Sequence, residues 1–181
     1  DLLKLLSELS QHLGPEAERE VGEAAARLLG RGSRFFMMHR AFEYIRSNQS
    51  GDAAEILTEM RDENDPVWHQ AQGHMLLKQG DKVGALQHFE KASRLLPQPE
   101  VFDTAAAVAH SCGQVDVAVE LLERLLNIDP EDVRSRQNCA FLYAQLNDFR
   151  NAARHFTTLC DLQPHHAQHA MNLAACLAQQ G

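Results

Sequence analysis

The sequence predicts an all-α protein built as a solenoid of antiparallel helix hairpins. Three stretches of the chain share one pattern, and they cover residues 80–97, 113–130 and 147–164. Each contains an early alanine, a later large apolar residue and a closing proline, at matching positions. The stretches recur with a period of about 34 residues, which indicates stacked helix pairs, each too small to bury its apolar face alone. We therefore expect about eleven helices in the chain.

Residues 1–34 are interpreted as N-terminal capping helices. Residues 2–13 place six leucines on one helical face, and Gly14-Pro15 begins a second helix that runs to about Leu29. Terminal units of a repeat array are usually atypical because they cover the exposed end of the core. The alternative for the leucine face is self-association or the binding of a partner helix.

Residues 35–65 are interpreted as a degenerate hairpin. Its helices are expected over 35–48 and 52–63, with Ser50-Gly51 as the turn between them. Ala54 is the candidate for the alanine at the close helix contact, although it lies nearer to Ala85 than Ala85 lies to Ala118.

Three regular units follow, over residues 66–98, 99–132 and 133–166. Each opens its second helix after a residue that tolerates positive φ, and each then has a small residue that lets two helix backbones approach. A large apolar residue one turn further fills the gap between hairpins, and a proline ends the unit. These four landmarks are Gly80, Gly113 and Asn147; Ala85, Ala118 and Ala152; Phe89, Leu122 and Phe156; and Pro97, Pro130 and Pro164.

The first helices of the units agree with this register. They are expected over residues 67–79, 100–112 and 133–146, and they contain small residues such as Gly73, Ala106 and Ala140. Residues 167–181 are interpreted as the first helix of a further unit, cut at its turn glycine, Gly181. Because the chain also starts at Asp1 without a methionine, we expect it to be a fragment of a larger protein.

On these residues the chain resembles the tetratricopeptide repeat family. That family has a small residue and an aromatic on the first helix, then Ala, Phe and Pro on the second, and residues 66–166 match it as three units. The resemblance implies a right-handed superhelical solenoid and a role in binding other proteins. It is specific for the fold and not for the function.

Composition limits the partners and the compartment. The formal net charge is -8 and the pI is about 5.6, so the chain as a whole repels nucleic acid phosphates. No apolar stretch approaches the roughly 20 residues needed to cross a bilayer, so no membrane insertion is expected. The four cysteines lack any CxxC spacing and lie in helical patterns, which favours free thiols and a reducing, cytoplasmic location.

No set of residues predicts catalysis, a metal or a cofactor, and the chain is therefore not interpreted as an enzyme. GxSxG, Walker-type, HExxH and GxGxxG motifs are all missing from the sequence. Cys139 and His155 could approach within one hairpin, but Cys139 occupies a packed position unsuited to a nucleophile. The cluster His165, His166 and His169 has helical metal-ligand spacing, yet it falls in an ordinary turn before a helix. The remaining histidines on helices are interpreted as surface or groove residues: His74, His88, His110 and His155.

An arginine-rich segment over residues 27–46 offers a second candidate surface. It carries five arginines against one glutamate, with Phe35, Phe36, Met37 and Met38 among them. It is interpreted as a core-facing apolar stripe with solvated arginines. The alternative is a docking surface for an acidic partner.

The concave side of such a solenoid is lined by the first helices and can hold an extended peptide or a helix. The partner-binding candidates are the non-core residues of these helices. They are Gln70, His74, Lys78, Asp103, Ala107, His110, Arg134, Gln137, Asn138, Phe141, Gln145, Gln168, Met171, Asn172 and Ala175.

Asn138 and Asn172 occupy equivalent places in successive units. This arrangement resembles the asparagine ladder of the repeat domain of O-linked N-acetylglucosamine transferases, in which such residues bind a peptide backbone. The equivalent residues upstream, Ala71 and Thr104, are not asparagines. Gln70, Asp103 and Gln137 stand where a carboxylate clamp would need positive charge, so binding of a chaperone tail is rejected.

The sequence thus predicts a protein-interaction scaffold that binds a partner polypeptide in its groove. One alternative is the repeat arm of a glycosyltransferase or sulfotransferase-like enzyme whose catalytic domain lies outside this chain. Another is a secretion-type chaperone, against which the extra N-terminal helices argue. The full-length sequence after Gly181 would discriminate among these functions.

Overall fold

The computed structural model describes residues 32–180 and, ahead of them, the single residues 20, 23, 27 and 30. This part of the chain folds into nine helices without a strand, as predicted for an all-α protein. The leucine face of residues 2–13 and the turn at Gly181 lie outside the described residues, as does nearly all of the predicted helix that ends at Leu29.

The chain divides into two compact units, Asp1–Asp81 and Lys82–Gly181. The described helices of the first unit are α3 (Arg34–Arg46), α4 (Ser50–Glu59) and α5 (Pro66–Gln79). They meet in one apolar core, in which the Trp68 indole donates a hydrogen bond of 2.7 Å to the carbonyl of Leu57. The buried core residues are Met38, Ala41, Ile45, Ala53, Ile56, Leu57, Trp68, Ala71 and Met75.

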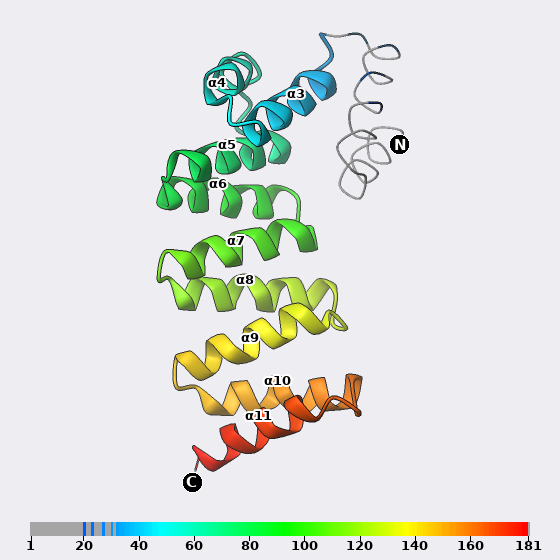
Figure 1. Cartoon of the computed structure of the whole chain (residues 1–181), viewed down its shortest axis with the longest axis vertical. Coiled ribbons are helices and arrows are strands. Elements are labelled where there is room, and N and C mark those ends of the chain that lie inside the picture. Colours follow the sequence, from blue (N-terminus) through cyan, green and yellow to red (C-terminus); the bar gives the residue numbers. More distant parts are fainter. Residues whose placement is uncertain (1–19, 21–22, 24–26, 28–29, 31, 181) are drawn as a thin grey trace. The chain divides into compact units, whose positions relative to one another are not determined.

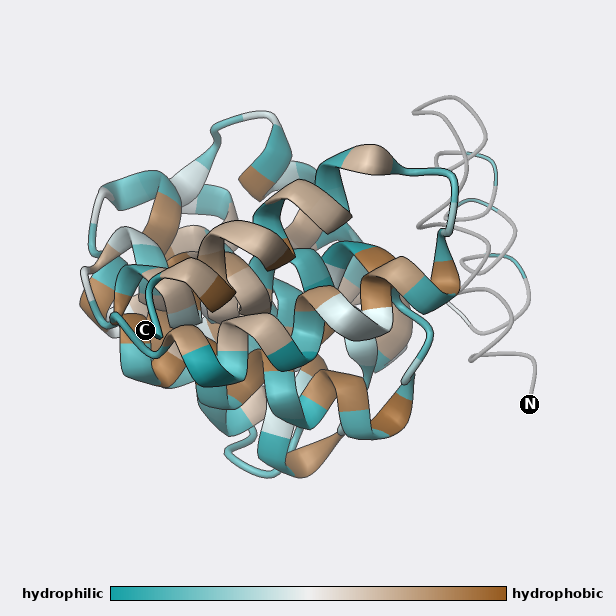
Figure 2. Ribbon diagram, turned by 90° about the horizontal axis from the view of Figure 1, so that it is seen from below, coloured by the Kyte–Doolittle hydropathy of each residue, from teal (hydrophilic) through white to brown (hydrophobic). Residues whose placement is uncertain are grey.

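The second unit contains six described helices that pack in chain order (Figure 1). They are α6 (Lys82–Leu95), α7 (Pro99–Ser111), α8 (Val115–Ile128), α9 (Val133–Gln145), α10 (Phe149–Leu162) and α11 (Ala167–Ala178). Apolar and polar segments alternate along these helices (Figure 2), which is the pattern of helices that bury one face.

One turn geometry recurs between the helices of the hairpins. Gly80, Gly113 and Asn147 all have positive φ, as the sequence predicted, and so does Asn48. In the turn at Asn147, the amide of the following residue, Asp148, donates 2.9 Å to the carbonyl of Tyr143. The same bond to a carbonyl five residues back closes the other three turns.

The predicted turn at Ser50-Gly51 is therefore wrong. The turn lies at Asn48, and Ser50 and Gly51 form the start of α4. An asparagine adopts the left-handed region more readily than other non-glycine residues, so Asn48 closes α3 while Gly51 keeps an ordinary helical backbone.

The contact alanine of this first hairpin also differs from the prediction. Ala53 is fully buried in the core, whereas Ala54 is only partly buried at its edge. Ala53 lies five residues after the turn residue Asn48, and Ala85, Ala118 and Ala152 stand at the same distance after theirs. These three alanines are fully buried as predicted.

Aspartates begin several of the helices. Asp65 accepts a hydrogen bond of 2.8 Å from the amide of Val67 at the start of α5, directly before Pro66. Asp132 and Asp148 cap α9 and α10 in the same way, through bonds of 3.0 Å and 3.1 Å. Each cap satisfies an amide that has no partner within its own helix.

Candidate functional site

The predicted binding residues of the second unit lie on the first helix of each hairpin, α7, α9 and α11, and none of them is buried. We call these residues the first-helix face. Its members are Asp103, Ala107, His110, Arg134, Gln137, Asn138, Phe141, Gln145, Gln168, Met171, Asn172 and Ala175.

Two contacts organise the charged and amide residues of the first-helix face. The Arg134 guanidinium forms an ion pair of 3.4 Å with Asp103, which joins α9 to α7. On α11, the Gln168 amide nitrogen donates 3.0 Å to the Asn172 side-chain oxygen. Arg134 therefore has an acidic neighbour of its own, and Asn172 has one of its two polar atoms already engaged.

Phe141 is the large apolar side chain at the centre of α9. It is 51% exposed, and its ring packs edge-on against the buried Phe156 with centroids 5.5 Å apart. Asn138 precedes it by three residues and so lies on the same side of the helix. Asn138 is exposed and makes no hydrogen bond with its side chain among the described residues. The free Asn138 amide thus lies on the same side of α9 as the Phe141 ring, which is supported by its contact with Phe156.

The first unit contributes three further candidates on α5, namely Gln70, His74 and Lys78. Lys78 is exposed, while Gln70 and His74 are half-buried. The His74 ring packs edge-on against Phe42 with centroids 6.1 Å apart, and burial lowers its pKa. His74 thus packs partly within its own unit.

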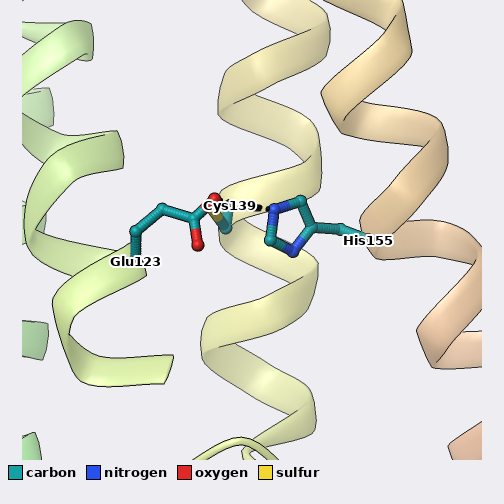
Figure 3. A group of neighbouring side chains, drawn as sticks. All are labelled: Glu123, Cys139 and His155. Atoms are coloured by element: carbon teal, nitrogen blue, oxygen red, sulfur yellow. Dashed lines mark hydrogen bonds and ion pairs between the residues drawn. The ribbon is translucent and has the colours of Figure 1, made fainter. Parts of the chain in front are cut away.

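A polar cluster also lies in the second unit, where side chains from α8, α9 and α10 point toward one another (Figure 3). The Glu123 Oε1 atom lies 3.0 Å from His155 Nε2, and the Cys139 Sγ atom lies 3.8 Å from the same nitrogen. Two neighbours complete it. The Tyr143 hydroxyl donates 3.0 Å to Glu123, and Arg154 forms an ion pair of 2.8 Å with the same carboxylate.

Burial dominates the protonation of this cluster. It raises the pKa of Cys139 to about 12, so the thiol stays protonated at neutral pH and is a poor nucleophile. Burial also lowers the pKa of His155, with the Glu123 charge acting in the opposite direction. For Glu123 burial acts to raise the pKa, but the Tyr143 hydrogen bond together with His155 and Arg154 lowers it on balance.

A comparison with known protein families supports the interpretation of the last helix pair as a structural repeat. The sequence model of the Tetratricopeptide repeat family matches residues 142–181, which span the end of α9, all of α10 and all of α11. The last helix pair of the chain is thus similar in sequence to a tetratricopeptide repeat. A TPR repeat-containing thioredoxin of Arabidopsis thaliana, TTL4, is 32% identical over 85 residues, which is 46% of this chain. The chain spans only 12% of that relative's length.

Three solved structures share the fold. YrrB, described as a TPR protein with an unusual peptide-binding site, matches 87% of this chain and 82% of its own with a TM-score of 0.67 at 18% identity. MamA matches 81% of this chain and 82% of its own, with a TM-score of 0.64 at 17% identity. Cut9 with Hcn1, an APC/C assembly, matches 87% of this chain and 32% of its own, with a TM-score of 0.63 at 18% identity. At these identities the likeness concerns the repeat fold alone.

Two interpretations of histidines need correction. His155 was expected on a surface or groove, but it is buried beside Cys139 because α10 presents it to the two preceding helices. His169 was expected among polar turn residues, but it is fully buried. Its Nε2 atom lies 3.0 Å from the Gln163 side-chain oxygen, and its ring stacks on the exposed His166.

Two arginines of the arginine-rich segment, Arg34 and Arg40, are paired within the first unit. Arg34 forms two hydrogen bonds with Asp65, of 2.5 Å and 2.8 Å. Arg40 donates 2.7 Å to the Tyr44 hydroxyl and lies over the Phe36 ring. Met38 is buried in the core. These contacts favour the interpretation of a core-facing stripe over that of a free basic surface.

Sequence reasoning missed three members of the polar cluster. Glu123 and Arg154 lie on helices other than α9, and only the packing of repeats brings them to Cys139. Tyr143 could have been found from the sequence, because it lies four residues after Cys139 and hence on the same helix face.

In the described part of the chain, no helix is long and apolar enough to span a bilayer.

Proposed function

We propose that this chain is a protein-interaction module that binds a polypeptide segment on its first-helix face. The observation that carries the proposal is the pairing of the free Asn138 amide with the half-exposed Phe141 ring. An extended peptide offers both a backbone to hydrogen-bond and side chains to bury, and this pair meets both needs on one helix. The rigid support of Phe141 by Phe156 reduces the entropy lost on binding.

The other exposed residues of this face fit a mixed partner sequence. Met171 is 64% exposed and adds a second, adaptable apolar contact. Arg134 and Asp103 neutralise each other in part, so we expect modest charge selectivity rather than a strongly acidic ligand. The peptide-binding site in the description of YrrB supports this class of function for the fold.

The test begins with peptides selected on the purified chain from a displayed random-peptide library. The double variant Asn138→Ala/Asn172→Ala should bind the selected peptide about 10- to 1000-fold more weakly, because amide-to-backbone bonds of about 1–3 kcal/mol are lost. Its melting temperature should stay unchanged, since neither amide packs in the core. Phe141→Ala should also weaken binding.

Matched variants distinguish this binding site from the other candidate sites. Asn127 is an exposed asparagine on the second helix α8, so Asn127→Ala should leave binding unchanged. Arg34→Glu/Arg40→Glu tests the arginine-rich segment. Normal binding by the asparagine double variant, together with loss of binding in the arginine variant, would move the site to the first unit.

A second candidate is that these repeats form the recognition arm of a larger protein with an activity elsewhere. The observation that favours it is the matched relative, whose name joins repeats to a thioredoxin and of which the chain spans 12%. The full-length sequence decides this point. A catalytic domain next to these repeats would make the peptide-binding face a means of substrate selection.

A further inference from the structure

The polar cluster unites three side chains that serve as metal ligands in proteins. Glu123 comes from α8, Cys139 from α9 and His155 from α10, and one ligand atom of each lies within 4.8 Å of the other two (Figure 3). Tetrahedral Zn²⁺, with bonds of about 2.0–2.3 Å, holds its ligand atoms roughly 3.3–3.7 Å apart. The observed separations of 3.0 Å and 3.8 Å to His155 Nε2 bracket this range.

We propose that Glu123, Cys139 and His155 form a Zn²⁺ site between adjacent repeats. Zn²⁺ binding would displace the thiol proton of Cys139 to solvent. The resulting thiolate, an imidazole and a carboxylate are the ligand types that zinc prefers, and the sulfur disfavours Mg²⁺ and Ca²⁺. Cys139 and His155 are buried, while the Glu123 side chain is 29% exposed. The cation and a fourth ligand, water, therefore reach the site from the Glu123 side.

Two neighbours of His155 Nε2 ask opposite hydrogen-bond roles of this nitrogen. The Arg154 guanidinium lies 3.1 Å from Nε2 and can only donate, so this contact requires a bare lone pair on the nitrogen. Glu123 lies 3.0 Å away and can only accept while ionised, so this second contact requires an N–H. One protonation state cannot serve both neighbours. A cation on Nε2 would bridge the nitrogen and the carboxylate once Arg154 turns away, and the imidazole proton would then lie on Nδ1, which is buried without a hydrogen-bond partner.

Arg154 is the group that competes with the metal. Its charge lies 2.8 Å from Glu123 Oε1, but its side chain is 61% exposed and can turn toward solvent. Tyr143 has a supporting role, because its hydroxyl donates to Glu123 Oε1 and its ring stacks on His155 with centroids 5.5 Å apart. Such contacts around the ligands hold them in orientation.

The expectation of no metal rested on the absence of CxxC spacing, on the histidines at residues 165–169, and on the interpretation of His155 as one of several scattered histidines. The present ligands lie 16 residues apart on three helices, so no spacing motif exists to reveal them. A bound cation would tie α8 to α9 and α10, and hence the repeat 99–132 to the repeat 133–166. Binding to the folded chain alone stabilises it by mass action.

The test is titration of the reduced chain, freed of metal by a chelator, with Co²⁺ and then Zn²⁺. We expect one Co²⁺ per chain with an absorption band from thiolate-to-cobalt charge transfer, and displacement of Co²⁺ by Zn²⁺. Cys139→Ala should abolish the band and weaken Zn²⁺ binding roughly 100-fold. Cys160 is a free, half-buried cysteine outside the cluster, so Cys160→Ser should leave both unchanged.

A second variant distinguishes a metal site from a hydrogen-bonded cluster. Arg154→Ala removes a positive charge next to the cation and should tighten Zn²⁺ binding about 10-fold. Weaker Zn²⁺ binding in Arg154→Ala would overturn the proposal, and so would the absence of the charge-transfer band from the unaltered chain. Stoichiometric Zn²⁺ that survives Cys139→Ala but is lost in His165→Ala/His166→Ala would place the metal on the surface histidines. The unaltered chain gives its spectrum whether or not a variant folds.

Discussion

His169 is a buried titratable residue that makes the stability of the fold depend on pH. It is fully buried, its Nε2–H donates to the Gln163 side-chain oxygen, and its Nδ1 atom is buried without a hydrogen-bond partner. Protonation would place a charge at Nδ1 with nothing to accept the new N–H. Burial therefore lowers the pKa of His169, and the nearby His166 adds to the effect.

We predict that the chain loses stability in mild acid. The unfolded chain takes up a proton at the ordinary histidine pKa of about 6.5, whereas the folded chain resists it at His169 and at His74. The stabilisation is fully present above pH 6.5 and is lost as the pH falls from there toward the lowered pKa values. Thermal unfolding measured from pH 7.5 to pH 5 should show a falling midpoint.

The matched variant for this prediction is His169→Gln, which keeps an N–H donor for Gln163 but cannot titrate. Its melting temperature should fall less steeply between pH 7 and pH 5 than that of the unaltered chain. Equal slopes for the two chains would mean that His169 is not one of the groups responsible.

At the scale of the element, the left-handed turn sets the register of every hairpin. Asn48, Gly80, Gly113 and Asn147 close their helices with the same bond pattern. Five residues later comes a fully buried alanine, and four residues after that comes a large apolar residue with almost no exposure. In the first hairpin these residues are Ala53 and Leu57.

We predict opposite effects for two glycine replacements. Gly113 has φ of +77°, so Gly113→Ala should destabilise the chain by about 1–2 kcal/mol although no atom obstructs the new methyl group. Gly51 lies in the first turn of α4 with ordinary helical φ and open space, so Gly51→Ala should stabilise by up to about 1 kcal/mol. Chemical unfolding of both variants measures the difference. Changes of the same sign would contradict the turn assignment.

A second prediction concerns the close helix contact. Ala118 is fully buried, so Ala118→Arg should cost about 1–3 kcal/mol or more through overpacking. Glu120 lies two residues further on the same helix and is exposed, so Glu120→Arg should change stability by only about 0.5 kcal/mol. Equal melting temperatures for these two arginine variants would refute the register.

Most of the helical pattern was predictable because its signals are local. Turn residues, proline stops and buried alanines fix helix ends within one or two residues, as at Gly80, Gly113 and Asn147. The turn at Asn48 was missed because Ser50-Gly51 is the stronger turn dipeptide, although the spacing to Ala53 and Leu57 would have revealed it. In the polar cluster, the approach of Cys139 and His155 was predictable from the sequence. Glu123 and Arg154 were not, since only packing between helix pairs brings them to Cys139.

At the scale of the molecule, stability should be distributed along the array. Each unit has its own core, and buried residues of α9, α10 and α11 form one cluster in the second unit. In such arrays stability is approximately a sum over repeats and the interfaces between neighbours. A destabilising substitution is therefore expected to weaken its own repeat and the adjacent interfaces most strongly.

We predict this locality for Phe156→Ala. Phe156 is fully buried in the second unit, so its loss should cost about 3–5 kcal/mol by leaving a cavity. Amide hydrogen exchange should quicken most in α9, α10 and α11 and least in α3 and α4 of the first unit. A uniform loss of protection across all described helices would show instead that the chain unfolds as one block.

The recurring turn also bears on how such a chain can change length over evolution. The turn residues Asn48, Gly80, Gly113 and Asn147 follow one another at nearly constant spacing, and each turn is closed by bonds within its own hairpin. Duplication or deletion of one such segment of a gene leaves every remaining junction with the geometry it already had. The array can therefore grow or shrink by whole hairpins. An insertion between the hairpins of α8 and α10 would separate Glu123 from His155 and so break the polar cluster.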